Sequence, residues 1–233
     1  MDFKLNEINR DSYDSFIRYL ISLKDIKNQI FVSKLIKTRY ILLGIKSGVI
    51  RDICKRINKI DIISFFKFSN NKYYEEVIIE GILLEKTEDF DIISNYVLNK
   101  VDNWGICDSL KAGFITKNLS FYFEKIEYLC SSNEEYLERF GFSLLRMYYL
   151  KTSEYLERIF ELIEKKSSSY YYVNMMKSWL LADIIVKFEK EALLFLNRST
   201  LDKWTFNKAI SKARDSFRVR DELKIYLKSF KKK

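Results

Sequence analysis

The sequence predicts an all-α protein, specifically an α-solenoid of antiparallel helical hairpins with a concave, basic face. The 233 residues include no proline and only six glycines, so residues that form tight turns are scarce. Apolar side chains recur at helical spacing along most of the chain. The longer predicted helices begin about 30 to 37 residues apart, the period of stacked helical hairpins. We expect one domain over residues 1–233.

Three helices are expected in the N-terminal part of the chain. Apolar residues at helical spacing predict helices over 9–28 and 31–37, and a third helix over 49–57. Gly44 is placed as a break before the third helix, and Ser47 as its N-cap.

From residue 61 onward, the pattern predicts a succession of helices with short connections. A four-helix bundle would need fewer and longer helices, so repeats are favoured. The predicted ranges are 61–68, 71–86, 89–100, 103–112, 118–131, 133–150, 152–165, 170–187, 189–197, 201–216 and 219–230.

The chain is basic, with 41 Lys and Arg against 32 Asp and Glu, a formal charge of +9 and a pI near 9.2. Such a surplus favours a polyanion such as nucleic acid, or an anionic membrane, and specifies neither. Lysine-rich, proline-free composition also arises from biased genomes. The net charge is therefore compatible with binding of nucleic acid and does not by itself indicate it.

Several kinds of site are excluded by composition. The sequence has no histidine, and its three cysteines are far apart, which excludes common zinc sites, Ser-His-Asp triads and Cys-His pairs. No glycine-rich phosphate loop and no apolar run long enough to span a membrane occur. An odd cysteine count without a signal peptide leads us to expect a cytoplasmic protein with buried thiols.

The segment over 103–112 carries the first candidate site. In a helix, Trp104, Asp108 and Lys111 would share one face, bringing a ring, a carboxylate and an ammonium together. The alternative is that Asn103 caps the helix and Trp104 is a core residue.

The helix predicted over 133–150 places Arg139, Ser143 and Arg146 on one face, beside an apolar stripe. Two arginines on an inward helix are costly unless an anion meets them. The alternative is that Arg139 is a solvated surface charge.

Two later helices carry further candidates. Over 170–187, Trp179 belongs to a stripe of Met and aromatic residues that is more often core than ligand site. In the basic final part, Lys208, Lys212 and Ser211 are placed to contact phosphates, although lysine tails such as residues 228–233 are equally often solvated.

These residues resemble the AlkD-like DNA alkylation repair proteins, DNA glycosylases built from HEAT-like (ARM-like) helical repeats. Five segments carry the resemblance in the family's order: Tyr40-Ile41-Leu42-Leu43-Gly44-Ile45-Lys46 leading into 49–57, Val101-Asp102-Asn103-Trp104 with Cys107-Asp108-Ser109, Glu138-Arg139, Tyr172-Val173-Asn174-Met175 through Trp179 to Lys187-Phe188, and Trp204-Thr205-Phe206-Asn207-Lys208-Ala209-Ile210.

The resemblance implies an activity and a set of site residues. It implies base excision repair of cationic N3- and N7-alkylated purines in double-stranded DNA, by a monomer without a membrane partner, metal or Schiff-base lysine. It implies that Trp104, Asp108, Arg139 and Trp179 surround the deoxyribose of the damaged nucleotide, and that the lesion is engaged without a base pocket. Lys111, Arg146, Lys208 and Lys212 are the DNA-backbone candidates.

This chemistry suits a site with one carboxylate. Ordinary glycoside hydrolysis needs a general acid and a second carboxylate. An alkylated purine is already positive, so it departs neutral without a proton. Asp108 would stabilise the oxocarbenium-like sugar and position water.

Two other functions stay open at this point. The residues between Trp104 and Asp108, namely Gly105, Ile106 and Cys107, depart from the family pattern, and the C-terminal arm is short. The alternatives are a non-catalytic HEAT-like paralogue that binds DNA, and a protein-binding scaffold.

Overall fold

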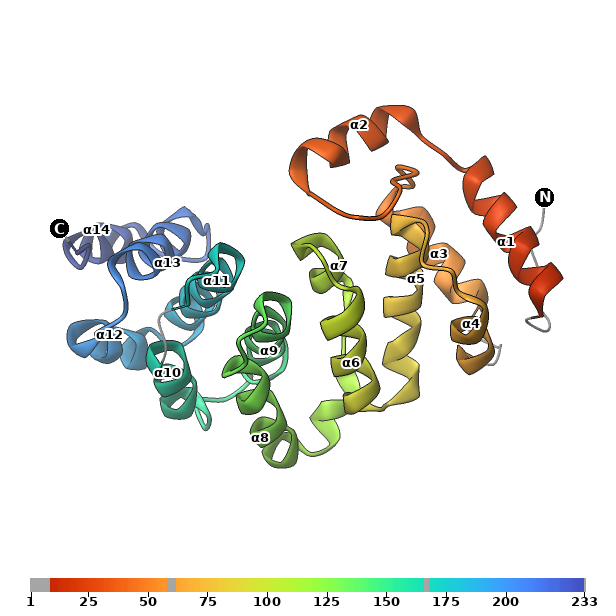
Figure 1. Cartoon of the computed structure of the whole chain (residues 1–233). Helices are drawn as coiled ribbons and strands as arrows, with labels where there is room; N and C mark the ends of the chain where they lie inside the picture. The colour runs from red at the N-terminus through yellow and green to blue at the C-terminus, as the bar shows by residue number, and fades with distance from the viewer. Residues whose placement is uncertain (1–8, 58–61, 166–167, 233) are drawn as a thin grey trace. The chain divides into compact units, whose positions relative to one another are not determined.

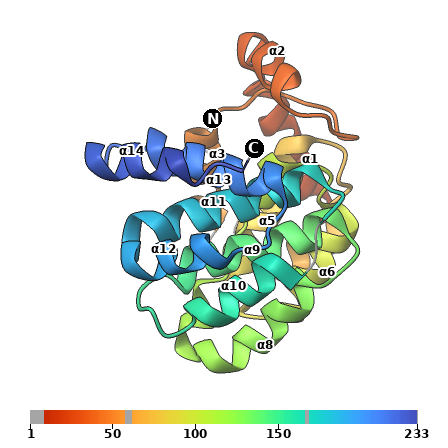
Figure 2. The same ribbon diagram turned by 90° about the vertical axis from the view of Figure 1, so that its left-hand side faces the viewer.

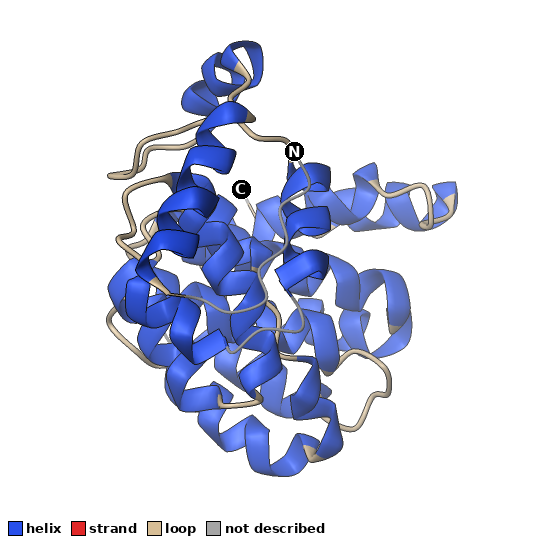
Figure 3. Cartoon of the chain, turned by 90° about the vertical axis from the view of Figure 1, so that its right-hand side faces the viewer, coloured by secondary structure: helices blue, strands red, loops and turns tan. Residues whose placement is uncertain are grey.

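The computed structural model describes residues 9–57, 62–165 and 168–232, and this part of the chain consists of helices and loops without a strand (Figures 1 and 3). The predicted all-α class is confirmed. The chain divides into two compact units, Met1–Phe114 and Ile115–Lys233, and each is described by itself.

In its described residues, unit 1 holds seven α-helices and a short 3-10 turn. They are α1 (Arg10–Ser22), α2 (Ile26–Leu35), α3 (Ser47–Ile57), α4 (Ile62–Phe68), α5 (Tyr74–Leu84), η1 (Glu85–Thr87), α6 (Phe90–Lys100) and α7 (Trp104–Ser109). A second 3-10 turn, η2 (Gly113–Lys117), spans the boundary with unit 2.

Helix α5 is the centre of unit 1. It packs against α3, α4, α6 and α7, and nearly all of its residues are buried. Two of its buried carboxylates hold loops: Glu75 accepts the backbone N–H groups of residues 43–45, and Glu76 accepts those of residues 70–73. These bonds satisfy backbone donors that would otherwise be buried unpaired.

The N-terminal helices differ from the prediction. The helix expected over 9–28 ends at Ser22, and Asp25 caps the separate helix α2 by accepting the N–H of Asn28. Gly44 does break the chain, with φ of +81°, and a Cβ there would lie 2.3 Å from the carbonyl oxygen of Asp25. Ser47 is the first residue of α3, not its cap.

Unit 2 also holds seven α-helices in its described residues. They are α8 (Leu119–Cys130), α9 (Glu135–Tyr148), α10 (Leu156–Lys165), α11 (Tyr171–Lys187), α12 (Glu189–Arg198), α13 (Lys203–Asp215) and α14 (Asp221–Ser229). The predicted ranges for this part agree to within a few residues. The start of the helix expected over 61–68 and the end of the lysine tail lie outside the described residues.

Alternate helices of unit 2 are neighbours, forming two rows (Figures 1 and 2). In one row α9 packs against α11, and α11 against α13. In the other row, Glu127 of α8 pairs with Arg158 of α10 at 3.2 Å, and the rings of Phe160 (α10) and Phe195 (α12) stack with centroids 4.1 Å apart. Each helix therefore contacts the helix two places further along.

Across the described residues, the helices are too short or too polar to form a membrane span.

Candidate functional site

Helix α7 begins as predicted and ends early. The side chain of Asn103 accepts the N–H groups of Gly105 and Ile106 at 2.9 and 3.2 Å, which confirms it as the cap. The helix stops at Ser109, and Leu110 is extended with ψ of 145°. Lys111 therefore lies beyond the helix, and the prediction that it shares a helical face with Trp104 and Asp108 is wrong.

The packing of Leu110 explains why α7 ends at Ser109. The Leu110 side chain is buried against α5, where a Cβ added at Gly81 would lie 2.6 Å from Leu110 Cδ2. Burying Leu110 there draws the chain out of the helix. Glycine at position 81 permits this close packing.

Trp104, Asp108 and Lys111 nevertheless meet, because all three line one cavity of about 760 Å³ within unit 1. Trp104 is half-buried, and its Nε1 donates to the carbonyl oxygen of Leu35 at 3.4 Å, so it is not a fully buried core residue. Asp108 is also half-buried. The remaining lining is half aliphatic, with polar groups at Asn28, Lys46, Ser47, Arg51, Tyr74, Glu85 and Ser109.

Gly105 allows the Tyr74 side chain of α5 to approach α7, the helix that carries Asp108. A Cβ at position 105 would lie 2.5 Å from the Tyr74 hydroxyl, so glycine there allows the tyrosine to approach α7. Burial raises the pKa of Tyr74, and the negative charges of Glu75, Asp102 and Asp108 raise it further. Tyr74 therefore stays a neutral phenol near the Asp108 carboxylate.

Arg139 is a buried cation of unit 2. Its side chain is 1% exposed, and Nη1 donates to the carbonyl oxygen of Tyr172 at 2.7 Å. The alternative that Arg139 is a solvated surface charge is therefore wrong. The hydrogen bond ties α9 to the first turn of α11.

Trp179 on α11 has three cations around its indole. The guanidinium carbons of Arg139 and Arg146 lie 5.9 and 5.4 Å from a ring centroid, and the ammonium of Lys212 on α13 lies 4.3 Å away. Each distance allows a cation–π contact. The indole is half-buried, so the Met and aromatic stripe of α11 is not wholly core.

Asp183 is a carboxylate near Trp179, and it pairs with two arginines. Its Oδ2 accepts from Arg146 Nε at 2.8 Å, and its Oδ1 accepts from Arg218 Nη2 at 3.4 Å. Burial, followed by the charges of Lys208 and Arg146, lowers the pKa of Lys212 from its ordinary value of 10.5. Cations therefore outnumber this carboxylate around Trp179.

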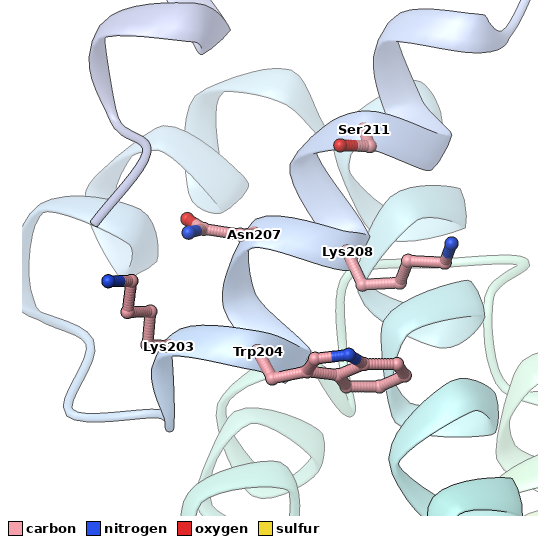
Figure 4. Close-up of a pocket in the computed structure, with 5 residues that line it drawn as sticks. All are labelled: Lys203, Trp204, Asn207, Lys208 and Ser211. Atoms are coloured by element: carbon pink, nitrogen blue, oxygen red, sulfur yellow. The ribbon is translucent and has the colours of Figure 1, made fainter. Parts of the chain in front are cut away.

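Lys208 and Ser211 lie on the next part of α13. They line a second cavity of about 430 Å³ together with Lys203, Trp204 and Asn207 (Figure 4). The exposure of Trp204 was not predicted from the sequence, because an aromatic side chain at helical spacing is usually a core residue.

The three cysteines lie in the interior of the protein. Cys54, Cys107 and Cys130 form no disulfide and are buried, as expected, and burial raises the pKa of Cys54 to about 12. Within the residues that the structure describes, no three His, Cys, Asp or Glu side chains group as a metal site would require.

The predicted site residues thus form two groups. Trp104, Asp108 and Lys111 belong to unit 1, whereas the group around Trp179 belongs to unit 2. That the two groups act on one ligand stays a prediction.

The described residues form an all-helical protein with one cavity lined by Asp108 and Trp104 and a group of cations around the indole of Trp179. The profile of one family, described as DNA alkylation repair enzyme, matches residues 16–213. The chain therefore belongs to the DNA alkylation repair enzyme family. No curated protein matches the chain.

Proposed function

We propose that this protein is a monofunctional DNA glycosylase that hydrolyses the N-glycosidic bond of cationic N3- and N7-alkylated purines in duplex DNA. The observation that carries the proposal is the group of three cations, Arg139, Arg146 and Lys212, beside the half-buried indole of Trp179, because guanidinium and ammonium groups are the side chains that bind DNA phosphates. Family membership supports DNA as the substrate. The acid and indole that line the unit 1 cavity support catalysis.

We further propose that the helices form HEAT-like repeats. The two rows of unit 2, in which each helix contacts the helix two places further along, support this architecture. The basic surface is proposed to lie on the concave side, where α9, α11 and α13 would present Arg146, Trp179 and Lys212 to DNA.

The reaction would need one carboxylate and no general acid. The bond between C1′ and the purine nitrogen breaks, its electron pair neutralises the positive purine, and the base leaves uncharged. Asp108 would stabilise the positive charge on the sugar and orient water toward C1′. The water oxygen bonds to C1′, and its proton passes to solvent. No metal takes part in this scheme.

The other residues would hold the DNA. Arg146, which is partly exposed, would contact a phosphate beside the lesion, and Lys111, Lys208 and Lys212 would add salt-sensitive affinity. The phosphate contact predicted for Arg139 requires its side chain to become exposed, because only 1% of it is exposed in this structure. The cavity beside Asp108 is lined by aliphatic and polar side chains together with the rings of Tyr74 and Trp104. Engagement of the sugar without a base pocket, by a monomer, is proposed from the family resemblance.

Base release from defined duplexes tests the proposal. Wild-type protein is incubated with duplexes that contain N7-methylguanine or the neutral lesions uracil and hypoxanthine, and free base is measured. We expect release of N7-methylguanine alone, because neutral bases need a proton donor to leave. Release of neutral bases at similar rates would contradict the mechanism.

The same assay distinguishes glycosylase activity from a second candidate function. Salt-dependent binding of the duplex without release of any base would identify a DNA-binding paralogue without catalysis. The hydrogen bond from Arg139 to the Tyr172 carbonyl favours this second candidate, because the Nη1 donor that makes it does not bind a phosphate.

A further inference from the structure

A row of aromatic side chains crosses the starts of three neighbouring helices in unit 2. The rings of Tyr136 (α9) and Tyr172 (α11) are stacked with centroids 6.3 Å apart. Tyr172 contacts Tyr171 edge-on at 5.3 Å, and Tyr171 contacts Trp204 of α13 at 5.4 Å. The row therefore leads from α9 to α13.

The last two rings of this row are open to solvent. Tyr171 is 54% exposed and Trp204 is 43% exposed, and their planes are tilted by 59°. Two large rings that touch each other and still expose this much surface are positioned to stack on a planar ligand.

Positive charge surrounds the exposed rings. Trp204 lines the 430 Å³ cavity with Lys203, Lys208 and Ser211, and Figure 4 shows Lys208 extending in the same direction as the indole, one turn further along α13. Asn207 forms the wall of the cavity, and it is fixed because its amide exchanges two hydrogen bonds of 2.9 Å with the backbone of Lys232. The cavity thus joins the Trp204 ring, which Tyr171 contacts, to the lysine and serine side chains of α13.

We propose that Trp204 and Tyr171 form a stacking site for one unpaired DNA base, whose phosphate is bound by Lys208 and Ser211. Stacking on aromatic rings beside lysines is how single-stranded nucleic acid is bound without sequence preference. Paired bases inside a duplex do not offer their faces, so the ligand is an unpaired nucleotide. The site rests on the proposed DNA binding and does not depend on base release.

Binding of two undamaged single strands tests the site. Fluorescence anisotropy compares short oligothymidylate with an oligonucleotide of the same length and charge that lacks the bases. We expect the wild type to prefer oligothymidylate by about tenfold, since stacking on a ring contributes that much per base. Trp204→Ala should abolish the preference, and Trp204→Phe should keep most of it.

A matched control uses another exposed ring of unit 2. Tyr128 on α8 is 76% exposed, so Tyr128→Ala removes an aromatic surface residue outside the cavity and should leave the preference unchanged. Equal wild-type binding of the two strands would overturn the proposal, as would a preference that survives Trp204→Ala. Because neither strand carries a lesion, failure here leaves the base-release result untouched.

Discussion

The ammonium of Lys212 lies 4.3 Å from a ring centroid of Trp179, on a surface that also holds two guanidinium groups. An indole attracts a cation through its negative face, but neighbouring cations repel one another. Lys212 is therefore held in a position where an additional anion would stabilise it. This relationship links the structure of unit 2 to the proposed DNA binding.

The pKa of Lys212 gives a pH-dependent prediction. Because the folded protein lowers this pKa, the charged lysine destabilises the fold, and the cost is lost as pH rises from the folded pKa toward 10.5. The free energy of unfolding of the wild type should therefore increase relative to Lys212→Gln across that range, measured by urea unfolding. A difference that does not change with pH would contradict the assignment. Undamaged duplex DNA should reduce the change, because a phosphate raises the pKa again.

Phosphate contact by Lys208 predicts a change in salt dependence. Lys208→Ala should weaken duplex binding and reduce the slope of log affinity against log salt by about one. The control is Lys190→Ala, because Lys190 is an exposed lysine of α12 in the same unit. Titrations at several salt concentrations measure both slopes. Equal slopes for the two variants would remove Lys208 from the interface.

Close packing at Gly81 predicts opposite effects for two glycine substitutions. Gly81→Ala should lower the free energy of unfolding by about 1 to 3 kcal/mol, because the new methyl group meets Leu110 and Tyr96. Gly48→Ala in α3 has no atom within 4 Å of its Cβ and should raise stability by about 0.5 to 1 kcal/mol. Urea unfolding measures both. Equal effects would show that α5 and α7 are not packed as described.

The buried charges of Glu138 and Lys177 predict strong coupling. Their charged atoms are 4.0 Å apart, and both side chains are almost fully buried, in α9 and α11. Lys177→Met alone should lower stability by about 3 to 5 kcal/mol, because it leaves a carboxylate buried without its cation. Adding Glu138→Gln should restore much of the loss. Simple additivity in a double-mutant cycle would contradict this pairing.

Much of the helical pattern could be predicted from the sequence because apolar spacing and caps act locally. Asn103 was placed correctly as a cap, and Gly44 as a break. The end of α7 could not be predicted, because the first glycine after Ser109 is Gly113, whereas the helix already stops at Ser109 through the burial of Leu110 against α5. Tertiary packing overrode the local preference there.

The sequence could supply candidate residues for the site but not the contacts between them. The resemblance to a repair family supplied Trp104, Asp108, Arg139 and Trp179. Periodicity could not show that Lys212 would approach Trp179, because the two side chains come from separate helices. The exposed ring of Trp204 was missed for the same reason, since its surroundings are built by α11 and α13 together.

The central claim is that one carboxylate, Asp108, is enough to cleave the bond to a base that alkylation has already charged. The direct test is the single-turnover rate of base release from N7-methylguanine duplex, for the wild type, Asp108→Asn and the exposed control Asp91→Asn of α6. The account predicts a rate about 100-fold lower for Asp108→Asn and an unchanged rate for Asp91→Asn. Equal rates for the wild type and Asp108→Asn, or no release by the wild type, would contradict it.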